Sequence, residues 1–234
     1  FFRSLRPLVE KFNPDKIILA LEGRPVRRLK MHEGYKATRT YDNSDGYSEQ
    51  RRVILELLKH LPVEVVRHPE READDVIGYF ALDGDWDHRV VVSSDTDFIQ
   101  LINADHRCKV YNPITKKMRD APCSDYVGWK SLVGDSSDNI DGFKGVGNKT
   151  ALKLMSDPNL LHEFLQKRQG VDRYEKNREL IAFEHVDIHD VEVFPGVADW
   201  QSLESRFKDL GFWSMVNKTS WPKYVKTFEG VRNV

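Results

Sequence analysis

Apolar positions in the first half of the chain follow two different spacings. Helical spacing marks residues 1–12, 48–61 and 70–82, whereas short continuous apolar runs mark residues 16–21, 63–66 and 89–93. Runs of the second kind are typical of strands buried on both faces of a parallel sheet. Alternation of such strands with helices predicts βαβ units. We therefore expect an α/β fold with a mostly parallel central sheet flanked by helices.

The second half of the chain has a different pattern. Tyr111–Thr115 is typical of a hairpin turn, and from Ser124 onward the chain is mostly helical with a glycine-rich break at Gly142–Gly147. A late apolar set predicts a terminal helix that packs back on the body: Leu203, Phe207, Leu210, Phe212 and Trp213. We expect three parts, an α/β core over 1–120, a helical region over 121–190, and a C-terminal segment over 191–234.

Composition excludes several classes of protein. With 36 Lys and Arg against 37 Asp and Glu, the formal net charge is −1, so total charge does not decide for or against nucleic acid. The two cysteines lack metal-binding spacing, which argues against structural zinc and indicates a reducing compartment. No apolar run approaches the roughly 20 residues of a membrane span. We expect a cytoplasmic monomer that binds no membrane.

Acidic residues open the helix predicted over 70–82. Glu72 and Asp75 are i,i+3 neighbours on one helical face, and Asp74 stands beside them. Acids near a helix start are also favoured by the helix dipole, so simple capping remains an alternative.

Other acids follow predicted strands. Asp95 and Asp97 come directly after the strand 89–93, and Glu22 follows the strand 16–21. Ligands of open α/β sheets bind at the carboxyl ends of the strands, so these side chains stand where a site is expected. A turn capped by aspartate side chains is the alternative for Asp95 and Asp97.

A further acidic pair, Asp135 and Asp138, has i,i+3 spacing in the segment 134–140. Carboxylate oxygens suit hard cations such as Mg²⁺ or Mn²⁺. So many carboxylates would repel one another unless metal ions neutralised them, which favours a site for two divalent ions that hydrolyses a phosphodiester. We expect Mg²⁺ as the natural ion and Mn²⁺ as a substitute.

Two further segments predict contacts with nucleic acid. The segment 141–151 has glycines, including Gly145 and Gly147, just before a helix; amides of such a turn bind phosphate, and Lys149 and Thr150 follow them. The segment 24–47 is polar and basic and predicted to be exposed. Its basic and aromatic side chains are typical of surfaces that hold single strands, although a solvated loop is the alternative: Arg28, Tyr35, Lys36 and Arg39.

Taken in order, these motifs resemble the 5′-nuclease family, which includes flap endonucleases, bacteriophage 5′→3′ exonucleases and the 5′-nuclease domain of bacterial DNA polymerase I. The similarity runs from about Ile17 to Ala151, with a shorter match in the tail. The motifs that carry it are Glu22-Gly23, Tyr35–Arg39, Glu72–Gly78, Ser93–Asp97, and Gly134–Ile140 with Gly145–Ala151.

The resemblance implies a PIN-like fold with a basic arch around 24–47 and a helix–three-turn–helix DNA-binding subdomain in 121–190. It implies catalytic roles for Lys36 and Arg39, and DNA contacts by Arg28, Tyr35 and the turn, where K⁺ can also bind. The implied metal ligands are Glu22, Glu72, Asp74, Asp75, Asp95, Asp97, Asp135 and Asp138.

Two features depart from the family. Glu22 stands where the family usually has aspartate. The family's first ligand aspartate lies on a strand that would precede Phe1; because the chain starts without Met inside a helical pattern, we expect a segment before Phe1.

The resemblance implies a structure-specific 5′ nuclease acting on DNA with 5′ ends, flaps or single-strand/duplex junctions, and on RNA in RNA–DNA hybrids, in a bacterium or a virus-infected host cell. Two alternatives stay open. One is a catalytically silent DNA-binding homologue. The other is a PIN-like ribonuclease, which would share the carboxylates.

Overall fold

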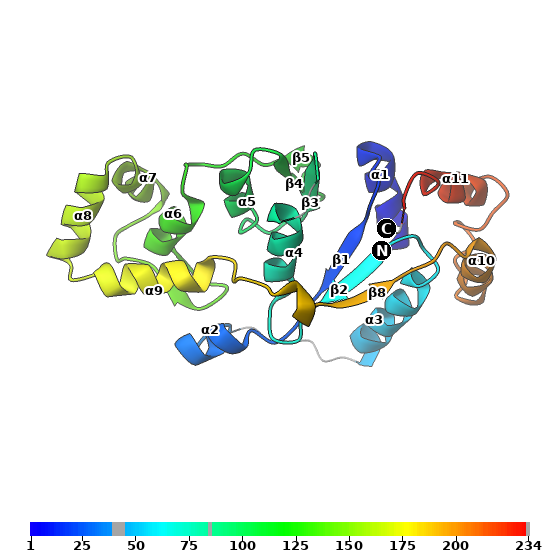
Figure 1. Ribbon diagram of the computed structural model, residues 1–234, viewed down its shortest axis with the longest axis horizontal. Helices are drawn as coiled ribbons and strands as arrows, with labels where there is room; N and C mark the ends of the chain where they lie inside the picture. Colours follow the sequence, from blue (N-terminus) through cyan, green and yellow to red (C-terminus); the bar gives the residue numbers. More distant parts are fainter. Residues whose placement is uncertain (39–44, 84–85, 233–234) are drawn as a thin grey trace. The chain divides into compact units, whose positions relative to one another are not determined.

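The computed structural model describes residues 1–38, 45–83 and 86–232. Its chain forms two compact units, each assembled from separated stretches of sequence (Figure 1). The first unit contains Phe1–Glu22, Tyr41–Pro69 and Ile188–Val234, and the second contains Gly23–Thr40 and Glu70–Asp187. The predicted division at residues 120 and 190 follows the order of the sequence, whereas these units do not.

The first unit is built on a three-stranded sheet in the order β1-β2-β8. Its elements are α1 (Phe2–Phe12), β1 (Ile18–Leu21), α3 (Asp45–Leu58), β2 (Glu64–Arg67), the 3₁₀ turn η1 (Ile188–Asp190), β8 (Glu192–Pro195), α10 (Trp200–Asp209) and α11 (Ser220–Thr227). β1 pairs with β2 in parallel, and β2 pairs with β8 in antiparallel register. The four residues of β1 are half-buried rather than fully buried as predicted, since β1 is an edge strand among the described residues.

The core of the first unit joins its two chain ends. Phe2 of α1 lies 5.2 Å from Phe207 of α10 between ring centroids, and Leu203 and Phe207 are completely buried. This confirms that a C-terminal helix packs on the body. Trp213 is 65% exposed, so the predicted apolar set ends before it.

The second unit holds the other predicted βαβ pattern and the helical region. Its elements are α2 (Val26–Met31), α4 (Ala73–Leu82), β3 (Arg89–Val92), α5 (Ile99–Ala104), β4 (Cys108–Asn112), β5 (Lys117–Met118), α6 (Tyr126–Val133), β6 (Gly134–Asp135), β7 (Ile140–Asp141), α7 (Asn148–Met155), α8 (Pro158–Lys167) and α9 (Val171–Ile181). β3 and β4 are parallel, and β4 and β5 form the predicted hairpin. In its turn, the Asn112 side-chain oxygen accepts hydrogen bonds from the amides of Ile114 and Thr115.

The α/β class is confirmed, and the sheets of the described residues are mixed rather than mostly parallel. These residues form two three-stranded sheets, each with one parallel and one antiparallel pairing, and the two-stranded pair β6-β7. Within the described part of the chain, no helix is both long and apolar enough to cross a membrane. In the second unit, α6 and α9 pack along each other (Figure 1).

Candidate functional site

A buried arginine, Arg28 of α2, holds the acids at the start of α4. Its Nη1 donates to Glu72 Oε2 at 2.6 Å and to Asp75 Oδ2 at 2.7 Å, and its Nη2 donates to Asp75 Oδ1 at 2.7 Å. Nε and Nη2 also donate to the carbonyl oxygens of Leu180 and Ala182. Arg28 is 3% exposed, so its predicted place on a DNA-binding surface is wrong in this structure. Its guanidinium is an internal counterion.

Asp75 has no oxygen left to offer a ligand. Besides Arg28, its Oδ1 accepts the amide of Glu184 at 2.8 Å and its Oδ2 accepts the amide of Glu72 at 3.1 Å. Glu72 and Asp75 form a reciprocal capping box at the start of α4, which is the capping alternative left open by the sequence. Asp75 is 1% exposed. We therefore correct its assignment from metal ligand to a residue that caps α4 and anchors Arg28.

Tyr35 connects this group to the second acidic motif. Its hydroxyl lies 2.8 Å from Glu72 Oε2 and 3.1 Å from Asp138 Oδ2. Burial, together with the charge of Glu72, raises the pKa of the Tyr35 phenol well above its usual range, so the hydroxyl stays protonated and donates. Because only 4% of Tyr35 is exposed, the predicted DNA contact by its ring is not met here.

The turn that carries Lys36 is fixed to the Asp138–Asn139 turn, about a hundred residues away in the sequence. The Lys36 amide donates to the Asp138 carbonyl at 3.1 Å, and Asn139 Nδ2 donates to the Gly34 carbonyl at 2.8 Å. His32 Nε2 lies 2.9 Å from the Asn139 carbonyl. The Lys36 ammonium pairs with Glu72 Oε1 and lies 3.8 Å from Asp138 Oδ2. The described residues thus bring the predicted catalytic lysine to two predicted metal ligands.

A second acidic group surrounds Lys130 of α6. Its ammonium pairs with Asp97 Oδ1 and lies 2.6 Å from Asp135 Oδ2. Tyr126 adds its hydroxyl at 3.4 Å from Asp97 Oδ1. Asp95 is exposed next to them, and its Oδ1 accepts the amide of Asp97.

Burial and charge oppose each other in this second group. Burial raises the pKa of Asp97 despite the attraction of Lys130. Burial acts the same way on Asp135, but the hydrogen bonds from Lys130 and Ser137 lower its pKa overall. Burial alone would lower the pKa of Lys130, yet Asp97, Tyr126 and Asp135 raise it, and the pKa of Tyr126 is raised by burial to about 12. The ammonium is therefore charged at neutral pH.

Ser137 connects the two groups. Its hydroxyl lies 2.6 Å from Asp135 Oδ1 and 3.5 Å from Asp138 Oδ1. We call the linked side chains from Asp75 to Asp97 the acid network: Asp75, Arg28, Glu72, Tyr35, Lys36, Asp138, Ser137, Asp135, Lys130, Asp97 and, at its edge, Asp95. The acids from three of the four predicted segments are thus brought together.

Three predicted residues lie outside the network. Asp74 is half-buried on α4. Glu22 is exposed after β1, in the other unit, and its role stays a prediction. Arg39 lies outside the described residues.

The expectation that only metal ions could make the acids tolerable is wrong, because Arg28, Lys36 and Lys130 neutralise part of the charge. Among the described residues, no three His, Cys, Asp or Glu side chains are close enough to form a ready metal site. Nevertheless, the described members of the acid network include six carboxylates and three side-chain cations. That excess of oxygen donors with negative charge fits added hard cations.

Two arginine side chains donate hydrogen bonds to backbone carbonyl oxygens of the glycine turn over 141–147. Arg173 Nη2 donates to the carbonyl oxygens of Asp141 and Gly142 at 3.1 and 2.6 Å, and Arg168 Nη1 donates to that of Lys144 at 2.8 Å. These carbonyls therefore face α8 and α9 and are occupied. Gly145, Gly147, Lys149 and Thr150 are all exposed.

Neither backbone conformation nor packing requires glycine at position 147, the N-cap of α7. Its φ is −99°, which any residue adopts, and a Cβ added there would meet nothing within 4 Å. Gly145 differs, since its φ of +80° favours glycine by conformation alone. The bare backbone at Gly147 therefore leaves room for a group that approaches from outside.

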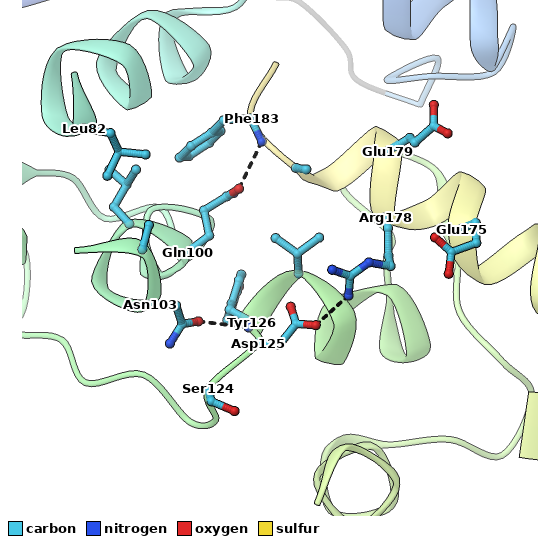
Figure 2. Close-up of a pocket in the computed structure, with 14 residues that line it drawn as sticks. Leu82, Gln100, Asn103, Ser124, Asp125, Tyr126, Glu175, Arg178, Glu179 and Phe183 are labelled. Carbon is cyan, nitrogen blue, oxygen red and sulfur yellow. Dashed lines mark hydrogen bonds and ion pairs between the residues drawn. The ribbon is translucent and has the colours of Figure 1, made fainter. Parts of the chain in front are cut away.

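A hollow of about 520 Å³ between α5, α6 and α9 is a separate feature (Figure 2). Part of its polar lining is already paired: Arg178 Nη1 donates to Asp125 Oδ2 at 2.6 Å, and the Gln100 side-chain oxygen accepts the amide of Phe183. None of the carboxylates of the acid network lines it. We do not assign the chemistry to this hollow.

Sequence reasoning missed Lys130, Arg168 and Arg173. Lys130 interrupts an otherwise apolar helix just before the Gly134–Ile140 motif, and a lysine on the buried side of a helix needs an acid partner. That local signal could have identified it. Nothing local marks Arg168 or Arg173, since their partners are backbone carbonyls of a distant turn.

Relatives of the chain are DNA polymerases I. The chain is 30% identical over 200 residues to DNA polymerase I of Lactococcus lactis subsp. cremoris, covering 78% of this chain and 22% of that protein. It is 32% identical over 169 residues to DNA polymerase I of Treponema pallidum, covering 66% of this chain and 17% of that protein. The chain thus spans about a fifth of the length of these relatives.

Solved structures share the fold. A crystal structure of the T5 D15 protein co-crystallised with metal ions has a TM-score of 0.63 at 19% identity, covering 97% of this chain and 90% of that one. The catalytic core of Rad2 in complex with DNA substrate has a TM-score of 0.54 at 16% identity, covering 100% of this chain and 84% of that one.

The family model that matches is described as the 5′-3′ exonuclease, N-terminal resolvase-like domain, and it covers residues 1–128. That stretch contains α4 with Glu72, the strand β3 with Asp95 and Asp97 after it, and the Lys36 turn. The chain belongs to the 5′-3′ exonuclease family.

Proposed function

We propose that this protein is a divalent-metal-dependent nuclease that hydrolyses phosphodiester bonds of DNA at 5′ ends, flaps or single-strand/duplex junctions. The observation that carries the proposal is the acid network, in which carboxylates from three separated segments are connected within one unit. Membership of the 5′-3′ exonuclease family supports the same reaction. The solved relatives include a T5 flap endonuclease complex with DNA and metal ions.

The carboxylates best suited to hold metal are those at the open end of the network. Asp95 is exposed, and Asp97 and Asp135 share the Lys130 ammonium, with the Ser137 amide and hydroxyl on Asp135 Oδ1 and the Tyr126 hydroxyl near Asp97. Glu72 and Asp138 would supply a second set of oxygens beside Lys36. Bound Mg²⁺ or Mn²⁺ ions would polarise the phosphodiester and lower the pKa of an attacking water.

The protein's own cations prepare the site for a polyanion. Lys36 stands on a turn held by the Asp138–Asn139 backbone, so its ammonium is positioned without a ligand. If a metal ion binds Glu72, the Lys36 ammonium is released from its ion pair and becomes available to the scissile phosphate. This fits the catalytic role that the family resemblance implies for Lys36. The catalytic role of Arg39, which lies outside the described residues, stays a prediction.

The decisive experiment compares cleavage and binding of a 5′-flap DNA. With Mg²⁺ we expect cutting, and with Ca²⁺ binding without cutting. Asp95→Asn removes one exposed charge and should reduce cutting by at least about a hundredfold, about 2.7 kcal/mol of transition-state stabilisation, while leaving DNA affinity within about twofold.

Three results discriminate the alternatives. Wild-type binding without metal-dependent cutting indicates the catalytically silent DNA-binding homologue. Preference for single-stranded RNA over flap DNA indicates the PIN-like ribonuclease. Cutting at the wild-type rate by Asp95→Asn contradicts the assignment of the open end.

We propose that the glycine turn and the start of α7 hold a DNA phosphate through backbone amides, with Lys149 and Thr150 beside them. The unexplained glycine at 147 is the observation behind this. K⁺ at the same turn would have to share carbonyl oxygens that already accept from Arg168 and Arg173. Its binding stays a prediction.

Gly147→Ala and Gly147→Ser test the phosphate contact. Each should weaken duplex binding roughly tenfold, about 1.4 kcal/mol, because the Cβ blocks the approach of the phosphate. Serine is a good N-cap, so the serine variant keeps α7 stable where alanine costs about 1 kcal/mol. Gly230→Ala is a matched control, since an added Cβ there also meets nothing within 4 Å. Wild-type affinity in both Gly147 variants would remove this contact from the proposal.

A further inference from the structure

Lys130 has the surroundings of a bound cation. It is 9% exposed, and its ammonium lies between Asp97, which follows β3, and Asp135, in β6. A buried ammonium is stabilised only where carboxylates compensate its lost hydration. Asp97 and Asp135 in turn have side chains that are 18% and 10% exposed, so solvent screens their repulsion poorly. Each partner therefore depends on the other.

The same two carboxylates are among the proposed metal ligands. A divalent ion and an ammonium cannot both occupy the space between Asp97 Oδ1 and Asp135 Oδ2. We propose that Lys130 takes the place of a divalent cation in the metal-free protein, and that metal binds at this position by displacing its ammonium. The inference rests on the proposed function, since it concerns the same site.

Two consequences follow from electrostatics. Lys130 holds the acids in position before metal arrives, so the metal-free fold does not have to tolerate adjacent unpaired carboxylates. Lys130 also competes with the metal, because an ion that binds between Asp97 and Asp135 must first break two ion pairs. Wild-type affinity for metal is therefore lower than the carboxylates alone would give. Lys130 is a positioning residue in this scheme, and its effect is on binding.

The contrast with Arg28 supports an exchangeable role. Arg28 makes five hydrogen bonds, two of them to backbone carbonyls, which fix it in place whatever the acids do. The Lys130 ammonium contacts side chains, namely those of Asp97 and Asp135, with Tyr126 nearby. A flexible four-carbon stem also lets an ammonium move where a guanidinium fork would not.

Direct Mn²⁺ binding to the DNA-free protein tests the proposal, with electron paramagnetic resonance reporting free Mn²⁺. Lys130→Gln keeps a hydrogen-bond donor without the charge, and Lys130→Met removes both. Each should bind Mn²⁺ about tenfold more tightly than wild type. Lys130→Arg keeps the charge and should bind no more tightly than wild type. Lys153→Met removes an exposed lysine on α7 and should leave affinity unchanged.

Thermal unfolding gives a second measurement. In EDTA the Lys130→Gln protein should melt below wild type, and saturating Mn²⁺ should raise its melting temperature more than that of wild type. A variant that folds only when Mn²⁺ is present supports the exchange as well.

The outcomes separate the two proposals. If wild type binds Mn²⁺ but the Gln and Met variants bind it equally or more weakly, the exchange is wrong and the nuclease proposal stands. If wild type binds no Mn²⁺ with or without flap DNA, the metal site and the exchange both fail.

Discussion

The two ends of the acid network neutralise closely spaced carboxylates in different ways. At one end, Arg28 and Asp75 are 3% and 1% exposed, and the Asp75 oxygens accept from a guanidinium fork and two backbone amides. At the other end, Lys130 holds Asp97 and Asp135 with side-chain contacts, and Asp95 beside them is exposed. One end is saturated and closed, whereas the other keeps oxygens within reach of solvent.

This difference distinguishes carboxylates that stabilise the fold from carboxylates that are available to bind metal ions. A carboxylate whose lone pairs are all taken by fixed donors stabilises the fold but has nothing to give a metal ion. A carboxylate paired with a mobile ammonium can exchange that partner. Sequence motifs do not distinguish these cases, because Asp75 and Asp97 both stand in acidic motifs at the ends of elements. Hydrogen-bond saturation does distinguish them.

Removing Arg28 should have the largest effect on stability. Arg28→Met leaves Asp75 as a buried charge without a counterion and Glu72 with only Lys36, so we expect a loss of about 3–5 kcal/mol in the free energy of unfolding. Urea denaturation monitored by circular dichroism measures it. Arg28→Lys restores the charge but not the fork, and should recover only part of the loss.

The two ends can be compared with the same kind of change. Lys130→Met in EDTA should cost less than Arg28→Met, since its carboxylates are less buried. Equal losses at the two ends would show that the lysine end contributes to the stability of the fold just as strongly as the arginine end does.

Substituting Asp75 and Asp95 in the same way compares the two ends through smaller changes in stability. Asp75→Asn replaces an acceptor of four hydrogen bonds by an amide whose NH₂ faces donors, and should cost about 1–3 kcal/mol of stability. Asp95→Asn is exposed and should change stability by less than about 0.5 kcal/mol, although it is expected to abolish most cutting. The same urea titrations measure both. A stability loss at Asp95 as large as that at Asp75 would contradict the division into a closed and an open end.

Local pattern predicted much of the fold. The helices α1, α3 and α4, the strands β1, β2 and β3, and the β4-β5 hairpin all fall on or within a few residues of their expected positions. Several elements were not predicted, among them the short helices α2 and α5, the pair β6-β7 and the strand β8. α2 has six residues in a basic segment, and the strands β6 and β7 have two residues each, so none has enough length to show a period.

The strand β8 shows why some elements cannot be predicted from the local sequence. All four of its residues are exposed, and it forms a strand because its backbone pairs with β2, about 130 residues earlier in the chain. Backbone pairing of this kind depends on the neighbour and leaves no apolar alternation to detect.

The family, the α/β class and the acidic motifs could be recognised before folding was considered, because apolar periodicity and short acidic motifs are local properties of the chain. The role of each charged side chain became clear only from its contacts in the folded protein. Folding buried Arg28 and Tyr35 away from solvent, fixed Asp75 in a helix cap, and put Lys130 between Asp97 and Asp135. Those roles depend on which donors meet which acceptors across separations of tens to more than a hundred residues, and that information appears only when the chain is folded.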